Sequence, residues 1–378
     1  MNFTRQELVA CLSVPGNPGS KECSSLVCHA LARMVRDSVV RSLPDAYRHL
    51  GSSLRQSGEL ADLVRWSPEF GLALAQLRSG DSLLAAVQYL VASWRSEFDV
   101  EVEFARNRRI LANGAIVQLR GATRIRSDGH RWEISSDEER VSFEGVRLLD
   151  ASENRHAESR VELTEGGPSY LVMSGLSATQ GIFPLRPSLL VGAETPSEAE
   201  ITKEEIARKL SHAMSLIRSE APASWDWISP VIDGFLITKG SLGRGISSST
   251  FPGLIALTRL ESELDYLDSL VSNATQQRLF QVLMVQELDD AESPGVSYLH
   301  SRRLYMSSRK LLIEAIENAH LIRLWRQILG SVPDAAALDR RIKRAIFQIR
   351  TEYEPVLNDG YGLSEAGRLL WRNAVDSI

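Results

Sequence analysis

The spacing of apolar residues changes twice along the chain, and this change limits the fold more than any other feature of the sequence. Between residues 21 and 96 apolar side chains recur at helical spacing, with breaks at proline or glycine. From about residue 98 to 193 they alternate in short runs separated by turns, which is typical of strands. After Pro196 the helical spacing returns. The chain is therefore expected to use both kinds of element, in separate regions.

These regions predict a mostly helical α+β fold. We expect an N-terminal helical region in residues 1–97, with a short first helix and then a bundle of four or so helices between residues 21 and 96, and an antiparallel β-rich middle in residues 98–195. A C-terminal helical domain is expected in residues 196–378. Asp128-Gly129 predicts a hairpin turn. Thr202 and Glu205 have the spacing of a capping box at a helix start.

Composition restricts the class of function. With 378 residues, 43% of them hydrophobic, the chain can bury a large core. The net charge of -5 argues against general nucleic-acid binding, which favours a basic surface. No apolar run approaches the ~20 residues that cross a bilayer, and the first residues make a poor signal peptide. We therefore expect a cytoplasmic protein without a nucleic-acid or membrane partner, whose cysteines Cys11, Cys23 and Cys28 are buried thiols.

Residues 240–286 hold the most informative stretch of the sequence. A loop rich in glycine and serine leads through a short apolar segment into a long helix with a buried stripe. In the middle of that helix the turn Ser272-Asn273-Ala274-Thr275-Gln276 is polar where the stripe would continue. Val231 to Ile237 read as a buried strand that leads into the loop. The polar turn is the first candidate for a functional site.

This frame resembles a known family. Ser247-Ser248-Ser249-Thr250, then Phe251-Pro252-Gly253, an apolar segment and a Leu270-Val271 step on a helix are similar to the HEXXH motif-containing peptide-modification proteins. These proteins belong to the biosynthesis of ribosomally made, modified peptides. Residues 62–68, the helix through Trp94, residues 311–326 and residues 362–367 also resemble parts of that family.

The resemblance implies a degenerate motif. In the family, Leu-Val is followed by His-Glu-x-x-His, whose histidines lie one helical turn apart and grip a metal together. Here Ser272, Asn273 and Gln276 stand at the His, Glu and His positions. Neutral hydroxyl and amide groups are poor ligands for zinc or iron(II), and Asn273 cannot accept a proton as glutamate would. We expect no metal here, but a polar cleft suited to holding a peptide.

Further residues are candidates for the substrate site because they lie in the segments that resemble the family. They are Arg244, Ser247, Ser248 and Ser249 in the loop, and Asn318 and His320 on the downstream helix. Each has a plainer reading, as part of a connecting loop or as a structural hydrogen-bonding residue. The basic run Arg302, Arg303, Arg309 and Lys310 could grip an acidic leader peptide, or could be a solvated helix entry.

The function expected on this basis is that of a catalytically degenerate relative. It would act as a peptide-binding or partner subunit for a precursor or carrier peptide, beside a partner biosynthetic enzyme and without a cofactor of its own. No Ser/His/Asp or Cys/His arrangement can be read from the sequence, so no catalytic residue is assigned. The alternatives are an active peptide-modifying enzyme, either an iron(II)- and 2-oxoglutarate-dependent hydroxylase or a metal-free one, and a helical interaction protein outside this family.

Overall fold

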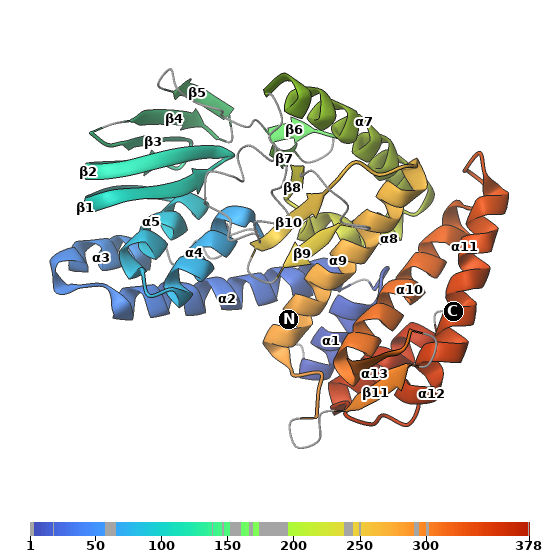
Figure 1. Ribbon diagram of the computed structural model, residues 1–378. Coiled ribbons are helices and arrows are strands. Elements are labelled where there is room, and N and C mark those ends of the chain that lie inside the picture. The colour runs from blue at the N-terminus through green and yellow to red at the C-terminus, as the bar shows by residue number, and fades with distance from the viewer. Residues whose placement is uncertain are drawn as a thin grey trace. The chain divides into compact units, whose positions relative to one another are not determined.

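The computed structural model in Figure 1 describes most of the chain. The described residues are 4–17, 19–56, 66–137, 139–145, 147–151, 160–165, 169–173, 196–237, 245–248, 251–290, 295–299, 302–376 and 378. The fold is mostly helical α+β, as the apolar spacing predicts. Among the described residues, no helix combines the length and the apolar character that a bilayer crossing requires.

The chain divides into two compact units, each built from separate segments. Unit 1 comprises Met1–Val27, Leu210–Val231 and Glu261–Ile378, and unit 2 comprises Cys28–Lys209 and Ile232–Leu260. The three consecutive regions expected from the sequence describe the order of elements along the chain. The compact units cut across that order, because residues 232–260 pack with residues 28–209.

Helices come first in the chain, as expected. They are α1 (Arg5–Ser13), α2 (Ser20–Ser42), the short 3-10 turn η1 (Asp45–Tyr47), α3 (Arg48–Gln56), α4 (Pro68–Arg78) and α5 (Ser82–Ala92). Local chemistry sets where α4 and α5 begin: the Ser67 hydroxyl accepts from the Phe70 amide and the Asp81 carboxylate from the Leu84 amide. Within the described part of residues 20–92 there are four α-helices, α2 to α5, in agreement with the predicted number.

Sheet A is an antiparallel meander in unit 2. Its strands are β1 (Glu97–Ala112), β2 (Ala115–Asp128), β3 (Arg131–Ser135), β4 (Arg140–Glu144) and β5 (Arg147–Ala151), paired in that order. The predicted hairpin turn lies between β2 and β3, where Asp128 Oδ1 accepts the amides of His130 (2.8 Å) and Arg131 (2.6 Å). The antiparallel middle region is therefore confirmed.

A buried glutamine joins sheet A to the helices that cover it. Gln88 on α5 is fully buried. Its side-chain amide donates to the Leu111 carbonyl oxygen (2.7 Å) and its oxygen accepts from the Leu111 amide (3.0 Å). The side chain thus satisfies both backbone groups of one residue of β1, as a neighbouring strand would. Figure 1 shows α4 and α5 lying along β1.

Sheet B is mixed, which the sequence does not predict. Its strands are β6 (Arg160–Glu162), β7 (Ser169–Met173), β8 (Gly234–Ile237), β9 (Ile246–Ser248) and β10 (Phe251–Leu257), in the order β6-β7-β8-β10-β9. β8 is the predicted buried strand and lies parallel to both β7 and β10. Parallel neighbours require a long connection. Between β7 and β8 the chain supplies it with α7 (Pro196–Glu220), α8 (Pro222–Ile228) and the turn η4 (Ser229–Val231).

One helix start differs from the prediction. α7 already begins at Pro196, so Thr202 lies inside the helix and does not cap it. Proline suits the first position of a helix, because its missing amide hydrogen is not needed there. The spacing of Thr202 and Glu205 therefore reflects two positions within a longer helix.

Unit 1 is built around two long helices, α9 (Glu263–Val285) and α10 (Ser308–Ile328). α10 contacts α9 and α11 (Ala335–Gln348), and Figure 1 shows it between them. A π-helical turn (Ile349–Tyr353), α12 (Glu354–Leu357) and α13 (Glu365–Val375) complete this helical end of the chain. A hairpin of β11 (Val296–Leu299) and β12 (Leu304–Ser307) precedes α10.

Candidate functional site

The polar turn of α9 lies inside the core of unit 1. Ser272 is 2% exposed and Asn273 is 1% exposed, and only Gln276 is partly accessible. The predicted stripe is buried from Leu267 to Leu279, whereas Met284 at its end is exposed. Burial also extends beyond the stripe to almost every side of α9 between Tyr266 and Val282. A peptide cannot reach Ser272 or Asn273 without displacing the core around this helix.

Two of the three motif side chains, Asn273 and Gln276, are held by hydrogen bonds to their neighbours. The Asn273 side-chain amide donates to the Ser269 carbonyl oxygen one turn earlier (2.8 Å). Gln276 reaches outward and donates from Nε2 to Glu317 Oε1 on α10 (2.8 Å). The Ser272 hydroxyl is buried and has no hydrogen-bond partner within the described chain. The turn is thus fixed by contacts within α9 and with α10.

His320 on α10 faces the same turn and is held neutral. Its Nδ1 lies 3.0 Å from Thr275 Oγ1, its ring packs edge-on against Trp227, and it hydrogen-bonds the backbone of Ser13. Full burial lowers the pKa of His320 to about 3, because the core disfavours the charged ring. This agrees with the plainer expectation of a structural hydrogen-bonding residue.

Asn318, the other candidate residue on α10, is also inside the core. It is 7% exposed, and its side-chain amide donates to the Tyr353 hydroxyl (3.3 Å). The same hydroxyl accepts from Arg302 (2.8 Å), which also pairs with Glu314 (2.6 Å) and Glu352 (3.2 Å). Arg302 is therefore committed to an internal cluster and is not available to grip a peptide, contrary to one reading of the basic run.

These side chains do not fit a transition metal. The polar groups that meet at the turn are the hydroxyls of Ser272 and Thr275 and the carboxamides of Asn273 and Gln276, with one neutral imidazole (His320) and one carboxylate (Glu317), both of which already have hydrogen-bond partners. Zinc and iron(II) favour several imidazole, thiolate or carboxylate ligands. Across the described residues, no group of three or more such side chains is placed to hold a metal ion. The donor set itself therefore argues against metal chemistry at Ser272, Asn273 and Gln276.

Two charged residues of α9 belong to the core, which sequence reasoning missed. Arg278 is fully buried and donates to the Trp227 carbonyl oxygen from Nε (3.0 Å) and NH2 (2.6 Å). Burial lowers its pKa to about 9, so the guanidinium stays charged at neutral pH. Asp268 is 3% exposed and accepts from Trp325 Nε1 (2.7 Å) and Arg341 (2.6 Å). Asp268 is therefore a buried carboxylate with two hydrogen-bond partners.

The loop residues of the candidate site are only partly described. Arg244 and Ser249 lie outside the described residues. Ser247 and Ser248 lie in β9, where Ser247 pairs with Ile255 and Ser248 with Phe251. β9 belongs to unit 2, whereas α9 belongs to unit 1. The structure thus brings Thr275 together with His320 and Gln276 together with Glu317, and it assigns Ser247 and Ser248 to the other unit.

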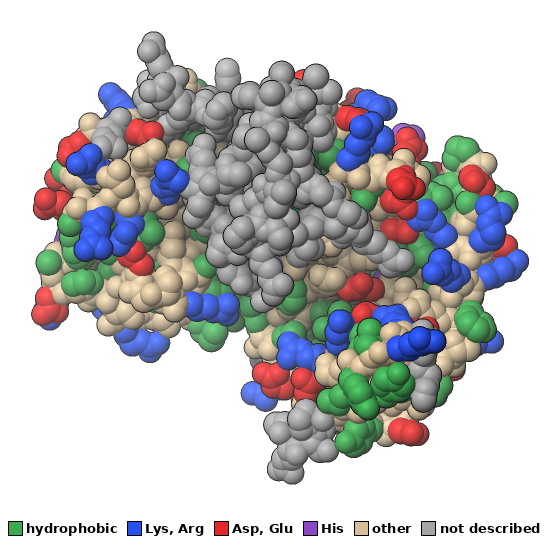
Figure 2. All heavy atoms as spheres, in the orientation of Figure 1, with side chains coloured by type: hydrophobic (Ala, Val, Ile, Leu, Met, Phe, Trp, Pro, Cys, Tyr) green, Lys and Arg blue, Asp and Glu red, His purple; other side chains and the backbone are tan. Residues whose placement is uncertain are grey.

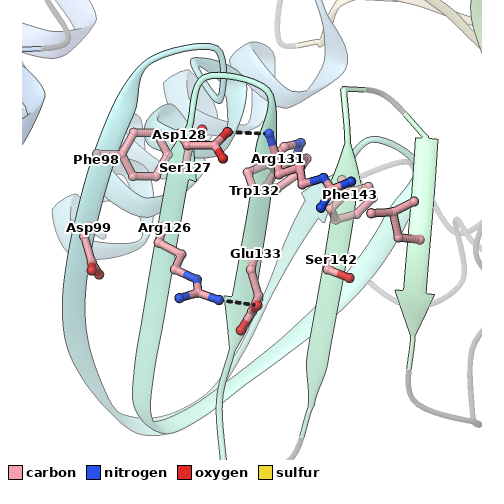
Figure 3. Close-up of a pocket in the computed structure, with 11 residues that line it drawn as sticks. Phe98, Asp99, Arg126, Ser127, Asp128, Arg131, Trp132, Glu133, Ser142 and Phe143 are labelled. Carbon is pink, nitrogen blue, oxygen red and sulfur yellow. Dashed lines mark hydrogen bonds and ion pairs between the residues drawn. The ribbon is translucent and has the colours of Figure 1, made fainter.

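A separate pocket of about 550 Å³ lies on sheet A (Figure 3). One row of side chains crosses four strands in register: Asp99, Arg126, Glu133 and Ser142. Each of the three charged residues in this row has a partner. Asp99 pairs with Arg124, whose hydrogen bonds lower the pKa of Asp99, and Glu133 accepts from both Arg126 and Arg140. In the sequence, this row is visible only as charged residues that alternate with apolar ones along the strands. In the structure these charged side chains pair with one another across the sheet.

The comparisons with known proteins add no relative. No family model matches the chain, and a search of curated proteins finds no similar sequence. The assignment of a function therefore rests on the chemistry of the described residues and on the resemblance in the frame of α9.

Proposed function

We propose that this chain is a cytoplasmic, peptide-binding partner protein in the biosynthesis of a ribosomally made, modified peptide, and that it recognises its peptide without modifying it. The proposal rests on which residues occupy the polar turn of α9. Where the resembled family has two metal ligands and a general base, this chain has Ser272, Asn273 and Gln276, set into the packing between α9 and α10.

The surroundings of that turn support a structural role. Asn273 is used to hold the preceding turn of α9, and Gln276 ties α9 to α10 through Glu317. The neighbouring imidazole of His320 has a pKa far below neutral, so near pH 7 it lacks the acidic second ring proton that an imidazolium donates as a general acid. Its ring is also enclosed and hydrogen-bonded, out of reach of a bound peptide.

A partner protein is favoured over a hydroxylase by the same chemistry. An iron- and 2-oxoglutarate-dependent enzyme needs open coordination positions beside protein ligands. A buried serine and asparagine supply neither the ligands nor the space. Helix α9 is better suited to stabilising the core of unit 1. The peptide would therefore bind to a surface elsewhere on this unit.

Co-expression with the precursor peptide of its biosynthetic cluster tests the proposal. We expect the peptide to co-purify with the chain and to keep its unmodified mass. Gln276→Ala, which removes the hydrogen bond with Glu317, should leave that result unchanged. A mass change produced by this chain alone, or a precursor peptide that does not bind, would overturn the proposal.

A further inference from the structure

The β11–β12 hairpin of unit 1 presents an aromatic face to solvent. Register places Val296, Tyr298, Tyr305 and Ser307 on one face, because Val296 pairs with Ser307 and Tyr298 with Tyr305. This face is exposed to solvent, with Val296 57% and Tyr305 74% exposed. On the opposite face Leu299 and Met306 are buried. Figure 2 shows hydrophobic side chains gathered at the surface where Figure 1 labels β11.

The two tyrosine rings of this face lie against each other. Tyr298 and Tyr305 are directly opposite across the hairpin, with ring centroids 5.0 Å apart. Exposed aromatic residues are costly to leave in water and are enriched in surfaces that bind protein chains. The two rings therefore form a ready platform for apolar side chains.

The edge of β12 carries backbone groups that the hairpin itself does not use. The Ser308 amide donates to the Gly295 carbonyl oxygen (2.9 Å), which makes 295 and 308 a hydrogen-bonded pair. In an antiparallel ladder such pairs alternate, so Tyr298 and Tyr305 form a non-hydrogen-bonded pair. The amide and carbonyl of Tyr305 thus point away from β11, and among the described residues no further strand pairs with β12. An added strand could pair there.

Positive charge lies at both ends of β12. Arg303 directly precedes the strand, and Lys310 lies in the first turn of α10 directly after it. Both are exposed, and neither forms an ion pair within the described chain. Arg309, by contrast, pairs with Asp289 at 3.6 Å. Because the whole chain carries a net charge of -5, two unpaired cations beside an aromatic strand are a local feature that favours an acidic partner.

We infer that β12 docks an acidic peptide segment in extended conformation. The peptide pairs its backbone with the outer edge at Tyr305, lays apolar side chains over the Tyr298 and Tyr305 rings, and sets carboxylates at Arg303 and Lys310. This inference rests on the proposed function, for which it supplies the peptide-binding surface. Alternation of acidic and apolar residues is the sequence pattern that such a strand requires.

Fluorescence anisotropy with a defined probe tests this surface. The probe is a fluorescein-labelled peptide of about ten residues that alternates glutamate and valine, a length that spans β12 and both cations at ~3.4 Å per residue. We expect saturable binding to the full chain that weakens as salt is raised. A peptide with lysine in place of glutamate should not bind. A probe N-methylated at alternate residues should bind at least about tenfold more weakly, because it cannot pair as a strand.

Matched substitutions on unit 1 locate the site. Arg303→Glu with Lys310→Glu should weaken probe binding by about tenfold or more, and Tyr305→Ala by about fivefold. Two exposed residues of α11 serve as controls of the same chemistry. Arg344→Glu and Phe347→Ala should each leave binding unchanged.

The outcomes separate this inference from the proposed function. No probe binding, or binding that the Arg303, Lys310 and Tyr305 substitutions do not weaken, overturns the hairpin site even if the precursor peptide co-purifies. A dimer in sedimentation velocity that Tyr305→Ala dissolves also overturns it, because a second copy then occupies the surface. Conversely, strong probe binding together with a mass change on the precursor peptide would uphold the site and refute the non-catalytic function.

Discussion

Replacing His320 by glutamine should remove the contribution of this buried histidine to the loss of stability in acid. The native ring has a pKa of about 3, against 6.5 for an unperturbed histidine. The unfolded chain therefore binds a proton below pH 6.5 that the native protein does not bind. The contribution of His320 to the free energy of unfolding is therefore fully present above pH 6.5, the pKa in the unfolded chain. It is lost as the pH falls from 6.5 towards 3.

The magnitude follows from the two pKa values. One pH unit between them is worth about 1.4 kcal/mol. Lowering the pH from 7 to 5 crosses about one and a half units of that window, so the wild-type protein should lose about 2 kcal/mol through this histidine alone. Other groups titrate equally in the two proteins, so they cancel when His320→Gln is compared with wild type.

Urea unfolding at pH 7 and pH 5, followed by circular dichroism, measures the effect. The His320→Gln protein starts less stable, because it loses the contacts of His320 with Thr275 and Trp227. Its loss between the two pH values should nevertheless be smaller than that of wild type by about 2 kcal/mol. His212→Gln, at an exposed histidine, should keep the wild-type loss. Equal losses in wild type and His320→Gln would refute the assignment of a buried, neutral ring.

Two further substitutions test the packing of each unit. Arg341→Met removes the cation that pairs with the buried Asp268 carboxylate (2.6 Å) and should lower the free energy of unfolding by about 2 to 3 kcal/mol. As a control, Arg340→Met at an exposed position should change the free energy of unfolding by less than about 0.5 kcal/mol. Equal urea midpoints for these two proteins would contradict the buried pair. Gly253→Ala should cost about 3 kcal/mol or more, because φ is +76° at Gly253 and a Cβ there would overlap the Trp66 carbonyl oxygen; unchanged thermal stability would count against this backbone geometry.

The fold class could be predicted because it depends on local periodicity. Alternation in β1 and helical spacing in α5 each report the face that an element buries. The turn at Asp128 could also be read, since its side chain caps the amides of the next residues along the chain. Such features need only residues a few positions apart.

The mixed sheet and the buried site could not be predicted, because both depend on distant partners. β8 lies between β7 and β10 only after α7 and α8 have carried the chain back, and no local pattern specifies that pairing. His320 is neutral because Ser13, Trp227 and Thr275 close around it from three other parts of the chain. A polar turn in a helix therefore suggested an open cleft, although its neighbours make it part of the core.

Metal stoichiometry tests the central claim most directly. The account holds that the α9 turn at Ser272, Asn273 and Gln276 cannot retain a transition metal. Protein purified after growth with added iron or zinc should contain far less than one metal ion per chain by plasma mass spectrometry, and Gln276→Ala should not change that content. One tightly held ion per chain that is lost on Gln276→Ala would contradict the account.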